Sequence, residues 1–150
     1  MKMPPPEKIP EAYSAIADNR IEMGEGRALI KSTDGKKIYL VEWLENVYSS
    51  NDNATYWQGY PGYPVIAVLM LQNRLPLNPE DAARFKGVNW SKLNKAHKNN
   101  YTAALEEVMN RLKGEGVDVE RLNQVIAATY EALAGLNLDI KRGKRKTAQV

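Results

Sequence analysis

The sequence predicts an α+β fold in which an N-terminal β-hairpin or small antiparallel sheet packs on a bundle of four to five helices, with helix dominant. Two observations predict this fold. Residues 20–45 alternate between short β-prone runs and glycine-containing turns, whereas apolar side chains recur at helical spacing after residue 63. The chain has 150 residues, which is the length of one domain with its own core. We expect a flexible proline-rich arm at 1–9, one globular domain at 10–140 and a flexible basic tail at 141–150.

The N-terminal elements are a short helix and a hairpin. Helix-forming residues follow Pro10, so we expect a short helix over 10–19. Two strong strands, RALIKS and KIYLVEW, flank Asp34-Gly35, and a weaker strand, RIEM, precedes them. A two-residue type I′ turn at Asp34-Gly35 requires positive φ at both positions. That turn fixes the register of the hairpin, which pairs Ile30 with Tyr39, Leu29 with Leu40 and Arg27 with Glu42.

The middle of the chain contains a polar and aromatic stretch followed by an apolar one. Residues 46–62 are rich in Gly, Pro and aromatic side chains, which predicts an irregular loop. Residues 65–71 (VIAVLML) are continuously apolar, a pattern that fits either a buried strand or a buried helix. Pro64 before this run and Arg74 after it favour the helix. Because this segment is apolar all round, we expect it at the centre of the fold.

The last part of the chain is predicted to be helical. Asn78-Pro79 is a good helix start, and Gly87 ends that helix. A further helix is expected from about Asn89. Apolar side chains then follow a helical stripe from Tyr101 to Leu112 and again from Leu122 to Leu133, with a glycine-containing break between them.

Composition excludes several classes of protein. The chain has no cysteine, so disulfide scaffolds and thiolate chemistry are excluded. No run approaches the roughly 20 apolar residues of a membrane span, and the N-terminus lacks the apolar core of a secretion signal. We therefore expect a soluble, cytoplasmic protein without a membrane span. The sequence makes no prediction of its oligomeric state.

The positive charge lies in the C-terminal segment. The chain has a formal net charge of +3, but residues 1–140 carry 16 Lys and Arg against 18 Asp and Glu. The excess comes from five cations in KRGKRK at 141–146, and such a segment binds polyanions by releasing their counterions. The leading hypothesis is a small non-catalytic protein that binds DNA or RNA weakly, through phosphates. The predicted contacts are Lys141, Arg142, Lys144, Arg145 and Lys146, with help from Lys92, Lys95 and Lys98.

An aromatic cluster suggests an alternative function. Six of the twelve aromatic residues lie between Trp43 and Tyr63. Large rigid rings on a loop can stack on bases or anchor a protein partner. The alternative hypothesis is therefore a protein interaction module that uses Tyr48, Tyr56, Trp57, Tyr60 and Tyr63. The competing structural interpretation is that the loop folds over the sheet and fills the core.

The sequence offers little for catalysis, so we predict no catalytic residue, no metal and no cofactor. The chain has one histidine, His97, in a lysine-rich run. Adjacent acids such as Glu80-Asp81 and Glu106-Glu107 diverge on a helix and do not converge on one point. Asn51-Asp52-Asn53 lacks the glycine and distal glutamate of a calcium loop, so we interpret it as turn chemistry. Gly24-Glu25-Gly26 lacks the rest of a phosphate-binding loop, so we interpret it as a turn between strands. An enzyme whose pocket is assembled from distant residues remains the third possibility.

Overall fold

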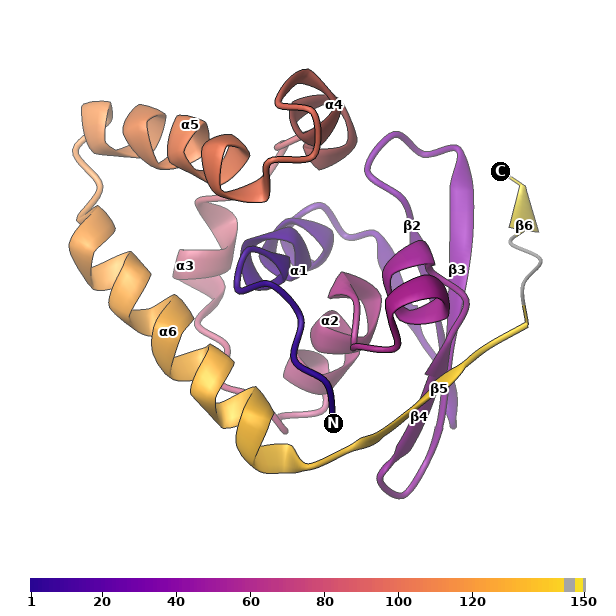
Figure 1. The fold of residues 1–150 in the computed structure, drawn as a ribbon. Helices are drawn as coiled ribbons and strands as arrows, with labels where there is room; N and C mark the ends of the chain where they lie inside the picture. Colours follow the sequence, from indigo (N-terminus) through magenta and orange to yellow (C-terminus); the bar gives the residue numbers. More distant parts are fainter. Residues whose placement is uncertain (145–147, 150) are drawn as a thin grey trace.

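A computed structural model describes residues 1–144 and 148–149 and places a mixed sheet beside a group of helices (Figure 1). The strands are β1 (Ile21–Met23), β2 (Arg27–Lys31), β3 (Lys37–Leu44), β4 (Val47–Ser50), β5 (Asp139–Arg142) and β6 (Ala148–Gln149). The helices are α1 (Lys8–Ala17), the π-helix η1 (Ala54–Gln58), α2 (Tyr63–Leu71), α3 (Pro79–Ala83), α4 (Trp90–Ala96), α5 (Tyr101–Gly114) and α6 (Val119–Leu136).

The prediction of a hairpin or small antiparallel sheet on four to five helices is wrong. The strand order is β1-β2-β3-β4-β5, and β6 pairs with the beginning of β3. Strands β1 to β4 are antiparallel neighbours, whereas β5 returns from α6 and adds to β4 in parallel. This parallel pairing joins segments about 90 residues apart, and no local pattern in the sequence indicates it. The described residues also form seven helices, more than the four to five predicted, and one of them, η1, lies in the stretch predicted to be an irregular loop.

The register of the central hairpin is confirmed, although its loop differs from the prediction. Arg27 pairs with Glu42, Leu29 with Leu40 and Ile30 with Tyr39. The loop is longer than two residues, because the last ladder bond joins the N–H of Ser32 to the carbonyl of Lys37. Only Gly35 in this loop has a positive φ, of 74°. The Asp34 carboxylate accepts hydrogen bonds from the Ser32 hydroxyl and the Lys36 N–H, which lowers the pKa of Asp34 and holds the longer loop.

The predicted irregular loop at 46–62 contains regular structure. Strand β4 follows β3 after a two-residue turn, with Leu44 opposite Val47, and η1 begins four residues after β4. The turn is made by Glu45-Asn46, with a positive φ of 55° at Glu45. No glycine marks this turn in the sequence, so the usual hairpin signal is missing.

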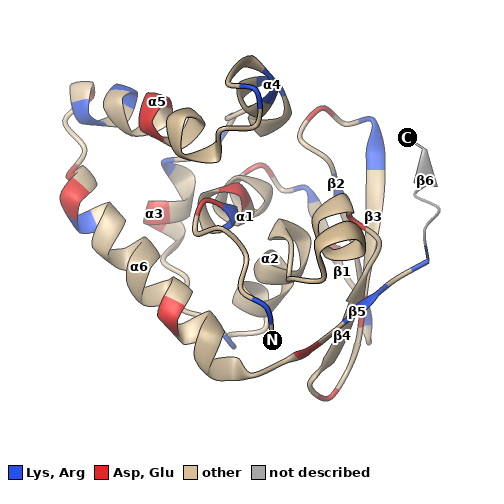
Figure 2. Ribbon diagram, in the orientation of Figure 1, with Lys and Arg blue, Asp and Glu red and all other residues tan. Residues whose placement is uncertain are grey.

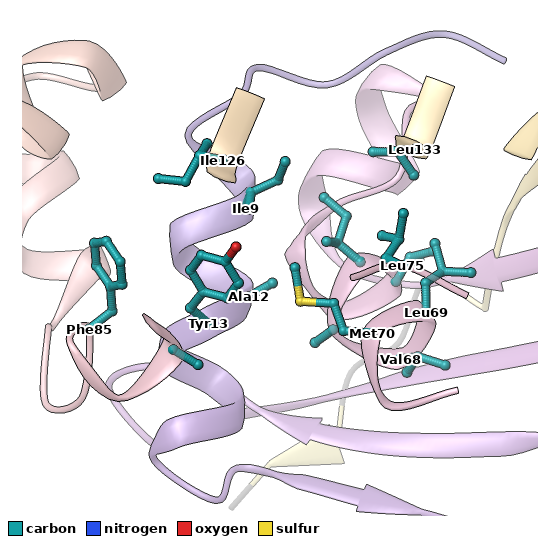
Figure 3. Close-up of a cluster of buried hydrophobic side chains, with 14 of the residues drawn as sticks. Ile9, Ala12, Tyr13, Val68, Leu69, Met70, Leu75, Phe85, Ile126 and Leu133 are labelled. Carbon is teal, nitrogen blue, oxygen red and sulfur yellow. The ribbon is translucent and has the colours of Figure 1, made fainter. Parts of the chain in front are cut away.

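The apolar segment is the helix α2 and lies at the centre of the fold, as predicted. All residues from Pro64 to Met70 are buried. Helix α1 packs across α2, and Figure 3 shows Tyr13 of α1 close to Met70 of α2 within the core. Tyr13 also stacks on Phe85 with ring centroids 5.8 Å apart. The core therefore lies between the sheet and α3, α5 and α6, with α2 in its middle.

The N-terminal residues are in contact with the helices. The Pro4 carbonyl accepts a hydrogen bond of 2.6 Å from the Tyr130 hydroxyl of α6, and Thr102 of α5 donates one of 2.8 Å to Glu7. Helix α1 begins at Lys8, two residues earlier than expected. The mobility expected for residues 1–9 and 141–150 stays a prediction. In the part of the chain that the structure describes, no helix combines the length and apolar character needed to cross a membrane.

Candidate nucleic-acid interface

Strand β5 carries the first two residues of the predicted basic site. It is an edge strand whose one described neighbour is β4, with Ser49 opposite Lys141 and Ser50 opposite Arg142. The pairing continues one residue further, because the Gly143 N–H donates to the Ser50 carbonyl at 2.8 Å. A Cβ on Gly143 would lie only 2.8 Å from the Ser50 carbonyl carbon, so the close approach requires glycine. The backbone therefore fixes where Lys141 and Arg142 leave the sheet.

The π-helix η1 presents the exposed part of the aromatic cluster. Asp52 holds its first turn by accepting a hydrogen bond of 3.1 Å from the Thr55 N–H. This bond supports the interpretation of Asn51-Asp52-Asn53 as turn chemistry. Within η1, the rings of Tyr56 and Trp57 meet edge to face with centroids 4.8 Å apart. The Trp57 side chain is 60% exposed, which is unusual for so large an apolar group.

The structure brings the aromatic and basic residues together, because η1 packs against β5. The Arg142 guanidinium carbon lies 4.6 Å from the centre of the Tyr56 ring, in cation–π geometry. On the other side, the Lys2 ammonium donates to the Gln58 carbonyl at 3.0 Å and lies 5.7 Å from the Tyr60 ring centre. We call these residues the aromatic-basic surface; its members are Lys2, Tyr56, Trp57, Tyr60 and Arg142. Lys141 precedes Arg142 in β5, so its side chain leaves the sheet on the opposite face, beside Asp139.

Of the aromatic residues predicted to contact a partner, Tyr48 belongs to the buried core and Tyr63 is partly buried against it. Tyr48 is 1% exposed and its ring stacks on Trp43. Its hydroxyl donates to the Gln72 side chain at 2.7 Å and accepts from Arg74 at 3.0 Å. Tyr63 lies at the start of α2, where burial raises the pKa of its hydroxyl. These two side chains therefore contribute to packing, whereas Trp57 is exposed and Tyr56 and Tyr60 are partly exposed.

The second predicted basic group lies elsewhere. Lys92 and Lys95 are exposed on α4, and Lys98 is exposed just after it. Figure 2 shows α4 at one end of the molecule and β5 toward the other, so these lysines do not join the aromatic-basic surface. Lys144 is exposed beyond Gly143. The two remaining predicted contacts, Arg145 and Lys146, lie outside the described residues. Contact of any of these cations with nucleic acid stays a prediction.

Groups considered for catalysis have structural partners. His97 ends α4 and its imidazole lies 3.3 Å from the Glu107 carboxylate. Asp81 of α3 is buried and forms an ion pair with Arg121 of α6. Gly24 begins a turn between β1 and β2, and its N–H donates to the Arg27 carbonyl at 2.8 Å. Across residues 1–144, no group of three or more His, Asp or Glu side chains is arranged to hold a metal ion.

Sequence reasoning missed two features of the molecule. Lys2 joins the aromatic-basic surface from the opposite end of the chain, and no local signal relates it to η1. The second feature is a buried polar cluster around Lys8, Glu11 and Asp52, all less than a tenth exposed. The three-residue spacing of Lys8 and Glu11 is the only sequence signal for this cluster, and it is equally typical of a solvent-exposed helix face.

The comparisons with known proteins give one match. The model of a family described as "Uncharacterised conserved protein UCP014422" matches residues 1–139. The matched region includes η1 and the buried polar cluster but ends at the first residue of β5. No curated protein and no solved structure matches the chain.

Proposed function

Because its family model covers nearly the whole chain, the protein belongs to the family of Uncharacterised conserved protein UCP014422, and we propose that it binds single-stranded nucleic acid. The observation that carries the proposal is the contact between Arg142 of β5 and Tyr56 of η1 at 4.6 Å. This contact places the Arg142 cation beside the ring pair of Tyr56 and the exposed Trp57. A single strand offers phosphates next to unstacked bases, and proteins bind it with basic grooves and stacking rings.

Trp57 supports a preference for single strands over duplexes. Its ring is mostly exposed and meets the Tyr56 ring in an edge-to-face contact. An unpaired base can stack on such a ring, whereas the bases of a duplex already stack on one another. The stacking contribution is about 1–3 kcal/mol per base. We therefore assign base stacking to Trp57 and phosphate contact to Lys2, Lys141 and Arg142.

The ionic environment of Lys141, at the same sheet edge, favours exchange with phosphate. Lys141 lies 3.7 Å from Asp139, and both side chains are more than half exposed. Exposed pairs of this kind contribute only about 0–1 kcal/mol and are screened by salt. A phosphate can therefore replace Asp139 at little cost. The proposal predicts an affinity that falls with salt, because binding releases condensed counterions.

The test is fluorescence anisotropy with a labelled 12-nucleotide strand and the matching duplex, at several salt concentrations. The full chain should prefer the single strand. Trp57→Ala should weaken binding by about 5- to 150-fold, the equivalent of one lost base stack. The double variant Lys141→Gln/Arg142→Gln should also bind more weakly, with a log–log salt slope smaller by about 1.4 for two lost phosphate contacts.

The matched control is Lys92→Gln/Lys95→Gln, which removes two exposed cations from α4. This variant should bind like the unaltered chain. The proposal is wrong if neither nucleic acid binds at low salt. If Trp57→Ala leaves the affinity unchanged but a chain ending at Ile140 no longer binds, the binding site consists of the basic tail alone. A protein partner that binds through Trp57 independently of salt would instead favour the protein interaction hypothesis.

A further inference from the structure

The sheet has one face that no described helix covers. Figure 1 shows the helices on one side of the sheet, and the burial of alternate side chains agrees with this view. On the covered face, the fully buried apolar side chains of β2 to β4 are Ala28, Ile30, Val41 and Tyr48. The opposite face is exposed or partly exposed. We call it the outer face; its members on β2 to β4 are Arg27, Leu29, Lys31, Ile38, Leu40, Glu42, Leu44, Val47 and Ser49.

One end of the outer face projects apolar side chains into solvent. Leu44 is 76% exposed, and Val47, directly opposite it on β4, is 40% exposed. Leu29 and Leu40, which are also opposite one another, continue this apolar character into the middle of the face. An antiparallel sheet with one solvated face normally carries polar side chains there. The adjoining exposed aliphatic side chains therefore indicate a contact surface.

A hollow of about 180 Å³ lies at the same end of the sheet as Leu44, on the other side of β2. Glu22, Arg27 and Leu29 line it, together with the turn between β1 and β2. The turn lies level with the end of β3, because the Gly26 carbonyl accepts a hydrogen bond of 3.1 Å from the Trp43 N–H. Its glycines place no side chain in this space, which has room for the four side-chain carbons of a leucine.

The outer face also carries two opposite charges between the hollow and Leu44. Arg27 and Glu42 are opposite one another in the register of β2 and β3, and both are exposed. Among the described residues, neither of them belongs to an ion pair. Both charges are thus available to a second surface that presents the same two charges in reversed order, which is the order in a second copy turned to face the first.

We infer that the outer face binds the outer face of a second copy of this chain. A twofold axis parallel to β2 and β3, and between them, places β2 of each copy over β3 of the other, with the strands aligned as in packed sheets. Arg27 of each copy then meets Glu42 of the other, and Leu29 meets Leu40. Leu44 of each copy enters the hollow of the other.

The size of the outer face sets the strength of this dimer. Four strands span about 19 Å, and the eight residues of β3 span about 26 Å. An outline of about 500 Å² per copy is at the lower limit for a specific protein interface. We therefore expect a dimer that forms at micromolar concentrations and dissociates on dilution. The axis places β1 over β4 and leaves β5 and η1 outside the contact, so this inference does not depend on nucleic-acid binding.

The experiment measures the mass of the full chain by sedimentation equilibrium, from micromolar to millimolar concentration. The mass should rise from the 16.9 kDa of one chain toward twice that value. Leu44→Glu should raise the dissociation constant at least about tenfold, because it places a charge in the hollow. The matched control Ala128→Glu puts the same charge on the exposed side of α6 and should associate like the unaltered chain.

A mixture of two variants tests the twofold arrangement directly. Arg27→Glu and Glu42→Arg should each stay monomeric, because like charges then meet across the axis. An equimolar mixture should form a dimer with one copy of each variant, with a dissociation constant within about threefold of that of the unaltered chain. The pairing of opposite charges within one sheet is lost in both variants, so only contacts between copies can restore association. This mixture decides the test if Leu44→Glu does not fold.

Three results would overturn the inference. The mass of a single chain at every concentration would show that the outer face is an ordinary solvated face. Association that persists in Leu44→Glu, or that is lost in Ala128→Glu, would place the contact elsewhere on the molecule. A mixture of Arg27→Glu and Glu42→Arg that stays monomeric would exclude this arrangement of the two copies.

Discussion

Two lysine–carboxylate pairs in this protein have similar geometry and opposite environments. Lys8 and Glu11 of α1 lie 3.2 Å apart, with side chains 9% and 8% exposed. Lys141 and Asp139 of β5 lie 3.7 Å apart, with side chains 61% and 57% exposed. The first pair is enclosed by protein, and the second is surrounded by water.

The comparison shows that exposure to water determines whether an ion pair contributes to stability or can exchange its partner for another ion. Removing a charge from water costs several kcal/mol, so each member of the buried pair depends on the other. The exposed pair gains about 0–1 kcal/mol and can exchange partners freely. The contrast implies a structural role for Lys8–Glu11, and it supports the proposal that Lys141 is available to phosphate. The following predictions test this contrast.

The largest effect is expected from Lys8→Met, which leaves Glu11 buried without its partner. Breaking a buried pair in this way costs about 3–5 kcal/mol. Urea unfolding should show this loss as a lower midpoint with an unchanged slope. The double variant Lys8→Met/Glu11→Leu removes both charges and should recover most of the stability. A loss below about 1 kcal/mol in Lys8→Met would break the comparison, because the pair would then behave like an exposed one.

The same variant should change how stability depends on pH. Burial raises the pKa of Glu11 above its ordinary value of 4.5, and the ion pair with Lys8 opposes this shift. Without Lys8, the folded-state pKa of Glu11 rises further above the unfolded value. A raised carboxyl pKa stabilises the fold fully below the unfolded pKa, and this stabilisation is lost as pH rises through the folded pKa. Lys8→Met should therefore lose stability relative to the unaltered chain as pH rises from about 4.5 toward neutrality. A constant difference across this range would contradict the assignment.

Local patterns in the sequence predicted the parts of the fold that local interactions determine. The register of β2 and β3 follows from apolar alternation around Asp34-Gly35, and α2 follows from an apolar run behind Pro64. Strand β5 was not predictable in this way, because its sequence, DIKR, shows no apolar alternation. Its place depends on free backbone groups of β4 and on the close approach of Gly143 to Ser50. Both depend on the tertiary fold rather than on neighbouring residues.

The candidate site shows the same division. The sequence indicated both the basic residues of β5 and the aromatic residues of η1, but as rival hypotheses. Their contact through Arg142 and Tyr56 arises only when η1 packs against β5. The sequence also grouped Tyr48 and Tyr63 with Trp57, because spacing along a segment does not show which rings turn inward. Asp52 was interpreted as a turn residue, which agrees with its hydrogen bond from the Thr55 N–H, whereas its burial depends on tertiary packing.

The smallest expected effect concerns the exposed pair. Asp139→Asn removes the carboxylate that competes with phosphate for Lys141, so the affinity for a single strand should rise about two- to threefold at low salt. The increase should disappear at high salt, since the exposed pair is then screened. The free energy of unfolding should change by less than about 1 kcal/mol, because the Asp139 N–H still donates to the Asn46 carbonyl. The control Glu120→Gln, an exposed acid on α6, should change neither quantity. Weaker binding by Asp139→Asn would mean that the carboxylate positions Lys141 for phosphate instead of competing with it. The exposed pair would then hold a fixed geometry, as the buried pair does, and exposure alone would not explain the difference between the two pairs.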